Sequence, residues 1–321
     1  MKSFQITAFG AAPALVEAPV PEPGKGEIRI KVAACGLNFA DLLMSEGTYQ
    51  DSPAPPFALG MELSGTVDKS GPDTVGPSAG TRVAAFSGSG GLAEYVCVPV
   101  SSCVTLPDDL SFEHAAGFLV AYGTSHLALS HRAQLSNGET LLVLGAAGGV
   151  GLTAVEIGKL MGARVIAVAR GAEKLAVARA AGADHLIDAE ADLRAEVKAL
   201  GGADVVYDAV GGDLFQAAMR ATRPDGRLLA IGFASGKVPQ VAANHLLVKN
   251  LSVIGFYWGG YLKFRPDLLT ASLATLLDWY AQGKLHPHVS HVLPLDRAAE
   301  GLALLRDRRS TGKVVIQITQ Q

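Results

Sequence analysis

Two groups of residues in the middle of the chain have the types and spacing that suit a dinucleotide. The glycine-rich segment 145–151 directly follows the apolar run 141–144 and precedes an amphipathic stretch at 152–160. Glycine permits a sharp turn and the close approach of a pyrophosphate, and the first N–H groups of a following helix favour negative charge. The segment therefore predicts a dinucleotide cradle whose contacts come from Ala146, Gly148, Gly149 and Val150.

The second group follows the next apolar run, 163–169. An NAD-binding unit carries an acid on the ribose about 20 residues after its glycine turn. This chain has Arg170 and Lys174 there, and charge-assisted hydrogen bonds of about 1.5–3 kcal/mol each to a 2′-phosphate would favour NADPH at least about tenfold. A plainer interpretation is that both side chains simply solvate the start of a helix.

Composition sets the outer limits of the function. The chain has 321 residues, 49% apolar and 18% charged, with a formal net charge of −3. This balance is typical of a globular enzyme and gives no electrostatic reason to expect nucleic acid or an anionic membrane as the main partner. Without a long apolar run or a signal-like N-terminus, the expected location is cytoplasmic. The three cysteines have no paired spacing and predict neither disulfides nor structural zinc.

The elements that would position these residues form two kinds of pattern. Up to about residue 112 the chain is β-rich, and from 138 onward apolar strands alternate with helices, which predicts an α/β fold with a doubly wound parallel sheet. Long helices are expected at 266–282 and 295–306, followed by a closing strand at 313–318. The expected strands are 27–33, 63–67, 82–85, 93–98, 140–144, 164–168, 185–187, 205–209, 227–232 and 251–254.

Five stretches in matching order make the whole chain resemble the zinc-independent quinone oxidoreductase (zeta-crystallin-like) branch of the medium-chain dehydrogenase/reductase superfamily. They are residues 34–41, 60–65, 145–151, 207–212 and 311–315. The resemblance implies a GroES-like catalytic domain at 1–121, completed by 259–321, and a Rossmann NADPH-binding domain at 122–258. It also implies a homodimer, for which the apolar strand 250–256 is the candidate edge.

The same resemblance argues against a catalytic zinc. The zinc-dependent relatives have a cysteine where this chain has Asn38 and a histidine where it has Met61, and they carry a four-cysteine lobe that is missing here. Catalytic zinc needs about three nitrogen, sulfur or oxygen ligands. The histidines 286, 288 and 291 are better explained as parts of a surface turn.

Without a metal, hydride would pass directly to the acceptor, and few side chains are available to assist. The spacing of Asn38, Asp41, Gly47 and Tyr49 is shared by quinone reductases and by related 2-enoyl thioester reductases, which makes Tyr49 and Asn38 the catalytic candidates. Tyr49 would hydrogen-bond a quinone oxygen or protonate an enolate, or else merely cover the substrate site. Asn38 would orient nicotinamide or substrate, and Asp41 would cap the following helix.

Further cofactor contacts come from the resemblance by position. They are Thr124, the strand-end residues Ile231, Gly232 and Phe233, the aromatic residues Phe256 and Tyr257, and Lys313. Thr124 as a helix cap and Lys313 as a strand-edge lysine are the simpler interpretations. Some bacterial relatives place a tyrosine against the adenosine phosphate where this chain has Asp188-Ala189, so the cofactor affinity is expected to be lower.

The function expected from these residues is an NADPH-dependent, zinc-free reductase of a quinone or a similar conjugated carbonyl. Two other functions stay open. One is reduction of an enoyl-CoA or another enoyl thioester, which the Tyr49 spacing permits. The other is a non-catalytic role as a dinucleotide-binding or RNA-binding crystallin-like protein, against which the lack of basic excess counts.

Overall fold

The computed structural model describes residues 1–319 and divides into two compact units. The first unit holds Met1–Val120 and the chain from Pro287 onward, and the second holds Ala121–His286. The expected boundary after residue 121 differs from this division by one residue, whereas the expected return at 259 does not coincide with it, because 259–286 groups with the second unit. Compactness does not say which residues act together, so the functional domain limits stay a prediction.

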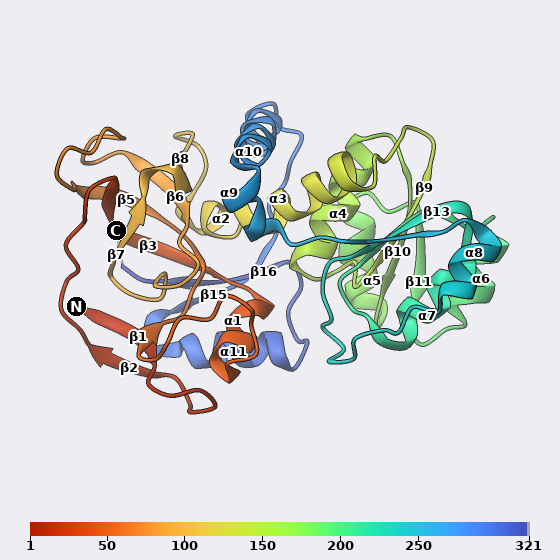
Figure 1. Cartoon of the computed structure of the whole chain (residues 1–321), viewed down its shortest axis with the longest axis horizontal. Helices are drawn as coiled ribbons and strands as arrows, with labels where there is room; N and C mark the ends of the chain where they lie inside the picture. The colour runs from red at the N-terminus through yellow and green to blue at the C-terminus, as the bar shows by residue number, and fades with distance from the viewer. Residues whose placement is uncertain (320–321) are drawn as a thin grey trace. The chain divides into compact units, whose positions relative to one another are not determined.

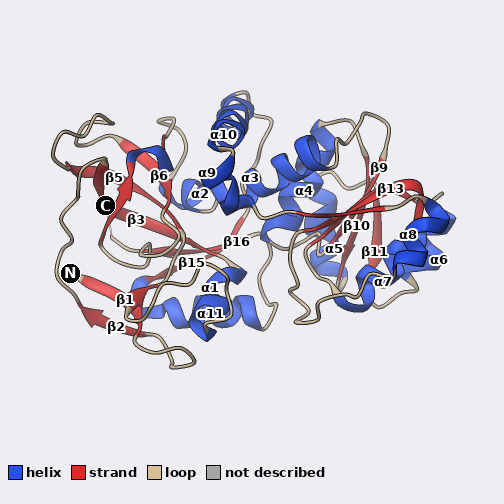
Figure 2. Cartoon of the chain, in the orientation of Figure 1, coloured by secondary structure: helices blue, strands red, loops and turns tan. Residues whose placement is uncertain are grey.

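A seven-stranded sheet frames the first unit (Figures 1 and 2). Its order is β15-β16-β3-β5-β6-β8, and β7 also pairs with β3. The strands are β3 (Glu27–Leu37), β5 (Glu62–Ser70), β6 (Arg82–Phe86), β7 (Tyr95–Pro99), β8 (Cys103–Thr105), β15 (Val289–Pro294) and β16 (Lys313–Gln317). A smaller sheet, β2-β1-β4, joins β1 (Lys2–Ile6), β2 (Ala14–Glu17) and β4 (Phe57–Ala58).

Strand β3 is central, because it pairs with β16, β5 and β7. The three residues Ile28, Ile30 and Val32 are fully buried in one apolar cluster, and this alternation is what fixes the register of the strand. The strands expected in this unit, including the closing strand at 313–318, are present as β3, β5, β6, β7 and β16. Strands β1, β2, β4, β8 and β15 were not expected.

Short helices close the first unit. They are α1 (Phe39–Glu46), α2 (Phe112–Ala116) and α11 (Ala298–Arg306), with 3₁₀ turns at Val100–Ser102 and Leu295–Arg297. Leu42 and Met44 of α1 and Leu302 of α11 pack with Phe4, Leu59 and Ile316 into a second apolar cluster. The chain segment that returns after Pro287 therefore supplies part of the core on which α1 rests.

The second unit contains a six-stranded sheet in the order β11-β10-β9-β12-β13-β14. All its pairs are parallel, which confirms the expected doubly wound α/β arrangement. The strands are β9 (Thr140–Leu144), β10 (Arg164–Ala169), β11 (His185–Asp188), β12 (Ala203–Asp208), β13 (Thr222–Ala230) and β14 (Ser252–Gly255). The order reverses between β9 and β12, and ligands of such sheets bind beyond the carboxyl ends of the strands at this point.

Helices follow most of these strands. They are α4 (Gly149–Leu160), α5 (Ala172–Ala180), α6 (Leu193–Ala199), α7 (Gly212–Ala221) and α8 (Ala243–Lys249). Side chains of α6 and α7, including Val197 and Phe215, pack on Leu142, Ile166 and Val206 of the sheet. Figure 1 shows α6, α7 and α8 at the same end of this unit. The remaining helical elements are α3 (Leu119–Leu127), a π-helical turn (Ala128–Arg132), a 3₁₀ turn (Trp258–Gly260), α9 (Tyr261–Phe264) and α10 (Pro266–Ala281).

Candidate functional site

The glycine turn lies at the carboxyl end of β9, at the switch point of the sheet. Gly145 has a φ of 73°, and Gly148 caps α4. A Cβ atom at Gly151 would collide with the carbonyl oxygen of Gly145, so only glycine allows this approach of helix to strand. The first N–H groups of α4, which begins at Gly149, have no partner within the helix. The turn therefore has the open backbone and the helix N-terminus that a pyrophosphate needs.

A buried group of hydroxyls, which no short sequence pattern indicates, holds the backbone at the start of α4 next to this turn. Ser125 Oγ lies 2.8 Å from Thr153 Oγ1 and 3.0 Å from Tyr207 OH, and it donates to the Val150 carbonyl at 2.9 Å. Burial raises the pKa of the Tyr207 phenol, so the group stays neutral. It joins α3, α4 and β12 and fixes the position of the backbone at Val150. Thr124, the expected cofactor contact, is the neighbour of Ser125 and is largely buried.

Arg170 and Lys174 lie where the sequence placed them, after the carboxyl end of β10. Gly171, with a φ of 78°, precedes α5, and Lys174 is in the first turn of that helix. The Arg170 side chain is 65% exposed. Since β10 pairs directly with β9, both cations stand beyond the strand next to the glycine turn.

The other expected contacts of the second unit follow the next strands on the far side of β9. Ile231, Gly232 and Phe233 follow β13, and Phe256 and Tyr257 follow β14. Phe233 and Tyr257 are partly exposed, whereas Phe256 is buried, with its ring centroid 5.5 Å from that of Tyr261. Phe256 therefore has an evident packing role. The structure brings these residues to the same edge of the sheet as the glycine turn, and their contact with a cofactor stays a prediction.

The loop after β12 is shaped by one buried carboxylate. Asp208 accepts hydrogen bonds from the N–H groups of Val210 at 2.8 Å and Gly211 at 2.9 Å. Burial raises the pKa of Asp208, although these two bonds oppose the shift. The side chain thus fixes the path of the backbone at the strand end adjacent to the glycine turn.

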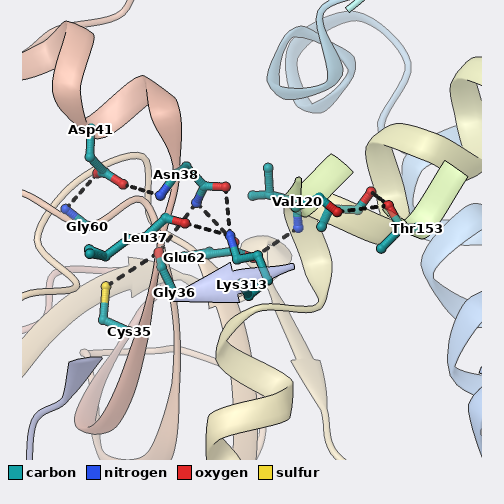
Figure 3. A network of polar contacts seen from close by, with 12 residues as sticks. Cys35, Gly36, Leu37, Asn38, Asp41, Gly60, Glu62, Val120, Thr153 and Lys313 are labelled. Atoms are coloured by element: carbon teal, nitrogen blue, oxygen red, sulfur yellow. Dashed lines mark hydrogen bonds and ion pairs between the residues drawn. The ribbon is translucent and has the colours of Figure 1, made fainter. Parts of the chain in front are cut away.

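In the first unit, Lys313, Glu62 and Asn38 form a buried polar cluster (Figure 3). The Lys313 ammonium donates to Glu62 Oε1 at 2.7 Å, to the Leu37 carbonyl at 2.8 Å and to Asn38 Oδ1 at 2.9 Å. These three acceptors match its three hydrogens. The cluster arises because β3 lies between β5 and β16, with Gly36 opposite Glu62 and Leu37 opposite Val314.

Glu62 connects this cluster to the start of α3. Its Oε1 also accepts from Asn38 Nδ2 at 3.0 Å, and its Oε2 accepts from the Val120 N–H at 3.0 Å. The Glu62 side chain is only 1% exposed and that of Lys313 8%. The amide of Asn38 is therefore held in one orientation, with its nitrogen toward Glu62 and its oxygen toward Lys313. Lys313 is engaged within its own unit, so its expected contact with a cofactor gains no support from its geometry.

Asp41 holds the Asn38 backbone and so braces the start of α1, as expected, although the N-cap residue itself is Asn38. Its Oδ2 accepts from the Asn38 N–H at 2.8 Å, and its Oδ1 accepts from the Gly60 N–H at 3.0 Å (Figure 3). Burial raises the pKa of the Asp41 carboxyl to about 6 despite both hydrogen bonds. Asp41 is thus a structural residue that positions Asn38.

Tyr49 follows α1 and is half-buried against the apolar cluster that contains Leu42 and Met44. Its aromatic ring therefore has a packing role as well as any catalytic one.

Within residues 1–319, no group of three or more histidine, cysteine, aspartate or glutamate side chains is arranged to hold a metal ion. His286 lies near Glu156, with 3.2 Å between Nδ1 and Oε1, and His288 Nε2 lies 3.0 Å from Thr311 Oγ1. No helix in the described part of the chain is long and apolar enough to span a membrane.

Comparison with known proteins identifies the class to which this geometry belongs. Residues 24–108 match the alcohol dehydrogenase GroES-like domain, and residues 149–277 match the zinc-binding dehydrogenase domain. The quinone oxidoreductase-like protein 2 homolog of Nematostella vectensis is 40% identical over 304 residues, which cover 92% of this chain and 83% of that protein. The chain belongs to the quinone oxidoreductase branch of the medium-chain dehydrogenase/reductase superfamily.

Solved structures agree with this placement. The quinone oxidoreductase of Thermus thermophilus, described with its NADPH complex, has a TM-score of 0.89 and 38% identity, covering 99% of this chain and 100% of that one. The Escherichia coli quinone oxidoreductase complexed with NADPH has a TM-score of 0.93 and 28% identity, with the same coverage. The expected GroES-like and Rossmann fold is confirmed, and the chain is an oxidoreductase of the medium-chain type.

Proposed function

We propose that this protein is an NADPH-dependent reductase that works without zinc and delivers hydride to a quinone or a similar conjugated carbonyl. The observation that carries the proposal is the edge of the parallel sheet, where the glycine turn after β9 stands beside Arg170 and Lys174 after β10. The adjoining residues suit a dinucleotide, since a Cβ at Gly151 would close the turn and two cations would favour a 2′-phosphate. The relatives solved with NADPH support the choice of cofactor.

NADPH would supply the hydride from its nicotinamide C4, and the protein would supply position. Ala146, Gly148, Gly149 and Val150 would hold the pyrophosphate through backbone N–H groups, while Ser125 keeps Val150 in place. Thr124, Ile231, Gly232, Phe233, Phe256 and Tyr257 would line the rest of the cofactor site. Since this chain holds the orienting groups rigidly, its catalysis would rest on positioning more than on acid–base chemistry.

The first-unit cluster would orient the nicotinamide through Asn38. Its Nδ2 donates to Glu62 and its Oδ1 accepts from Lys313, which leaves Oδ1 the capacity for one further donor, such as a carboxamide N–H, whereas a quinone oxygen offers no donor. Lys313 would act through Asn38, and its direct contact with the cofactor is a weaker part of the proposal. The zinc-free assignment rests on Asn38 and Met61 standing at two ligand positions of the zinc enzymes, and on Glu62 being paired with Lys313.

A second candidate function, reduction of an enoyl thioester, rests on Tyr49. Tyr49 follows the carboxyl end of α1, whereas Asn38 and Asp41 lie at its amino end, and the Tyr49 phenol would donate the proton that such a reaction requires. A quinone needs no such specific donor at carbon. The two functions therefore differ in how strongly they depend on Tyr49.

The test is steady-state oxidation of NADPH and NADH by purified, chelator-treated protein, with a simple quinone and a trans-2-enoyl-CoA offered in parallel. Fast turnover of NADPH with the quinone alone supports the proposal. Turnover with only the thioester moves the assignment to an enoyl reductase, and loss of activity on chelation contradicts the zinc-free assignment. Cofactor binding without turnover of either acceptor would indicate the non-catalytic alternative.

We also propose a cytoplasmic homodimer without nucleic-acid partners. Strand β14 is the end strand of the second unit's sheet, and Leu247 and Val248 of the preceding helix α8 are 78% and 72% exposed. An end strand with exposed apolar side chains on the preceding helix favours pairing with a second copy. Light scattering of the purified protein would measure the mass, and a monomer at micromolar concentration would contradict this part of the proposal.

A further inference from the structure

The turn that carries Arg170 is tied to the end of the neighbouring edge strand. Asp188 is the last residue of β11 and stands opposite Ala169 of β10. Its Oδ2 accepts from the Gly171 N–H at 3.0 Å, and its Oδ1 accepts from the Glu190 N–H at 3.0 Å. These bonds to Glu190 and Gly171 lower the pKa of Asp188, so it remains ionised at neutral pH. One carboxylate thus holds the backbones of residues 171 and 190 in fixed positions.

The hydrogen bonds of Asp188 hold the turn so that the Glu190 carboxylate lies near Arg170, the cation expected to bind the 2′-phosphate. Glu190 Oε1 lies 4.0 Å from Arg170 Nε, and the two side chains are 79% and 65% exposed. A pair so exposed contributes little to folding stability, because water and salt screen it. Its effect is on the ligand, since a second anion must compete with Glu190 for Arg170.

We propose that Glu190 is a specificity-determining residue that limits the preference for NADPH over NADH. The proposal rests on the function proposed above. A 2′-phosphate is a dianion that would approach Arg170 against the charge of Glu190, whereas the 2′-hydroxyl of NADH is neutral and meets no such opposition. Arg170 and Lys174 set the sign of the preference, and Glu190 reduces its size.

The chain places this acid on a different strand from the one that NAD-binding enzymes use. Their acid follows the second strand and accepts hydrogen bonds from the ribose. Here the second strand, β10, is followed by Arg170, and Glu190 comes within 4.0 Å of Arg170 from the turn after the third strand, β11. If Glu190 instead accepted the ribose hydroxyl, its removal would weaken NADH binding, so the two roles predict opposite results.

The experiment compares Glu190→Gln with the unaltered chain by calorimetric titration of adenosine 2′,5′-bisphosphate and 5′-AMP, and by fluorescence titration of NADPH and NADH. Energies of exposed charge pairs convert to an expected gain of about two- to fivefold for the two 2′-phosphorylated ligands. NADH and 5′-AMP should bind as before. The gain should shrink as salt is added, because the interaction is screened.

Glu196→Gln is the matched control. Glu196 is exposed on α6 of the same unit, and its substitution changes the net charge by the same amount. An equal gain in both variants, equal changes for NADPH and NADH, or a loss of NADH binding in Glu190→Gln would overturn the proposal. Failure of the unaltered chain to bind any 2′-phosphorylated ligand would overturn the proposed function as well, so the two failures are distinguishable.

Discussion

Two pairs of a cation and a glutamate in this molecule differ in separation and in exposure to water. Lys313 and Glu62 are 2.7 Å apart and nearly inaccessible to water, and each has further hydrogen-bond partners. Arg170 and Glu190 are 4.0 Å apart, and most of each side chain is exposed. A buried pair cannot lose one member without leaving a charge in a low-dielectric interior, whereas an exposed pair can.

The buried pair sets the geometry of the first-unit cluster, whereas the exposed pair would affect only which ligand is preferred. The buried pair fixes the orientation of Asn38. A substitution in this pair is therefore expected to lower the free energy of unfolding as well as to change the reaction. The exposed pair holds nothing in place, because Asp188 sets the backbone on both sides of it. Its members can therefore be substituted to change ligand preference at little cost to folding.

The largest effect is expected from Glu62→Gln. The neutral amide keeps the shape of the side chain but leaves the Lys313 ammonium buried without a counter-charge, which costs about 3–5 kcal/mol of the free energy of unfolding. Urea denaturation measures this loss. In the double variant Glu62→Gln with Lys313→Met, the orphan charge is gone, and part of the loss should return.

The exposed pair supplies the contrast for that measurement. Glu190→Gln should change the free energy of unfolding by less than about 1 kcal/mol. If the loss in the double variant equalled the sum of the losses in Glu62→Gln and in Lys313→Met alone, or if Glu62→Gln and Glu190→Gln lost similar stability, burial would not distinguish the two pairs.

A pH-dependent effect of about 3 kcal/mol at most is expected at Asp41. Its pKa is about 6 in the folded protein against an ordinary value of 3.8, because burial disfavours the charge. Folding therefore favours the protonated form, and its stabilising contribution is full below about pH 3.8 and is lost as the pH rises to about 6. The stability difference between the unaltered chain and Asp41→Asn should fall over this interval.

Asp188 should show the opposite sign. Hydrogen bonds from Glu190 and Gly171 lower its pKa, so its contribution is present above the unfolded pKa and is lost as the pH falls. Denaturation of Asp41→Asn and Asp188→Asn between about pH 2 and about pH 7 compares the two, because the Asp188 contribution is lost below the ordinary pKa of 3.8 and the Asp41 contribution is lost above it. Differences that slope in the same direction for both variants would contradict the assignment of burial as the cause at Asp41.

Substitution of Arg170 is expected to change selectivity and leave stability nearly untouched. Arg170→Ala removes a charge-assisted bond to the 2′-phosphate, so the ratio of NADPH to NADH affinity should fall about tenfold or more. Arg179→Ala, at the exposed end of α5, is the control for the loss of one positive charge. An equal fall in both variants would mean that Arg170 acts through the general field of the protein alone.

The sequence predicted the second unit better than the first for a physical reason. Strand β9 consists of five buried residues, of which the last four are the apolar run 141–144. Strand β15, with the sequence VSHVLP, alternates weakly and contains a histidine, so it resembled a surface turn. Strands β1 and β2 are short and lie in the small sheet, where much of β2 faces water.

The residues of the candidate site divide in the same way into those that a local sequence pattern indicates and those that it does not. The glycine turn is local and was visible in consecutive residues, as was the Arg170 segment. The pairing of Lys313 with Glu62 joins residues 251 positions apart, and that of Ser125 with Tyr207 joins residues 82 positions apart. No short-range pattern encodes such contacts, since they exist only after the sheets have formed.

Tyr49 lies between the two extremes of the comparison, half-buried and at the end of a helix, and its substitution should have the smallest effect if the quinone function is correct. Tyr49→Phe keeps the ring that packs on the apolar cluster and removes only the hydroxyl. Loss of one neutral hydrogen bond of about 0.5–1.5 kcal/mol predicts a fall in kcat/KM of about tenfold or less with a quinone. If Tyr49 were a proton donor to an enolate, kcat with an enoyl thioester would fall by about 10²–10⁴. Steady-state kinetics with both acceptors separates these cases, and unchanged rates with both would reduce Tyr49 to a packing residue.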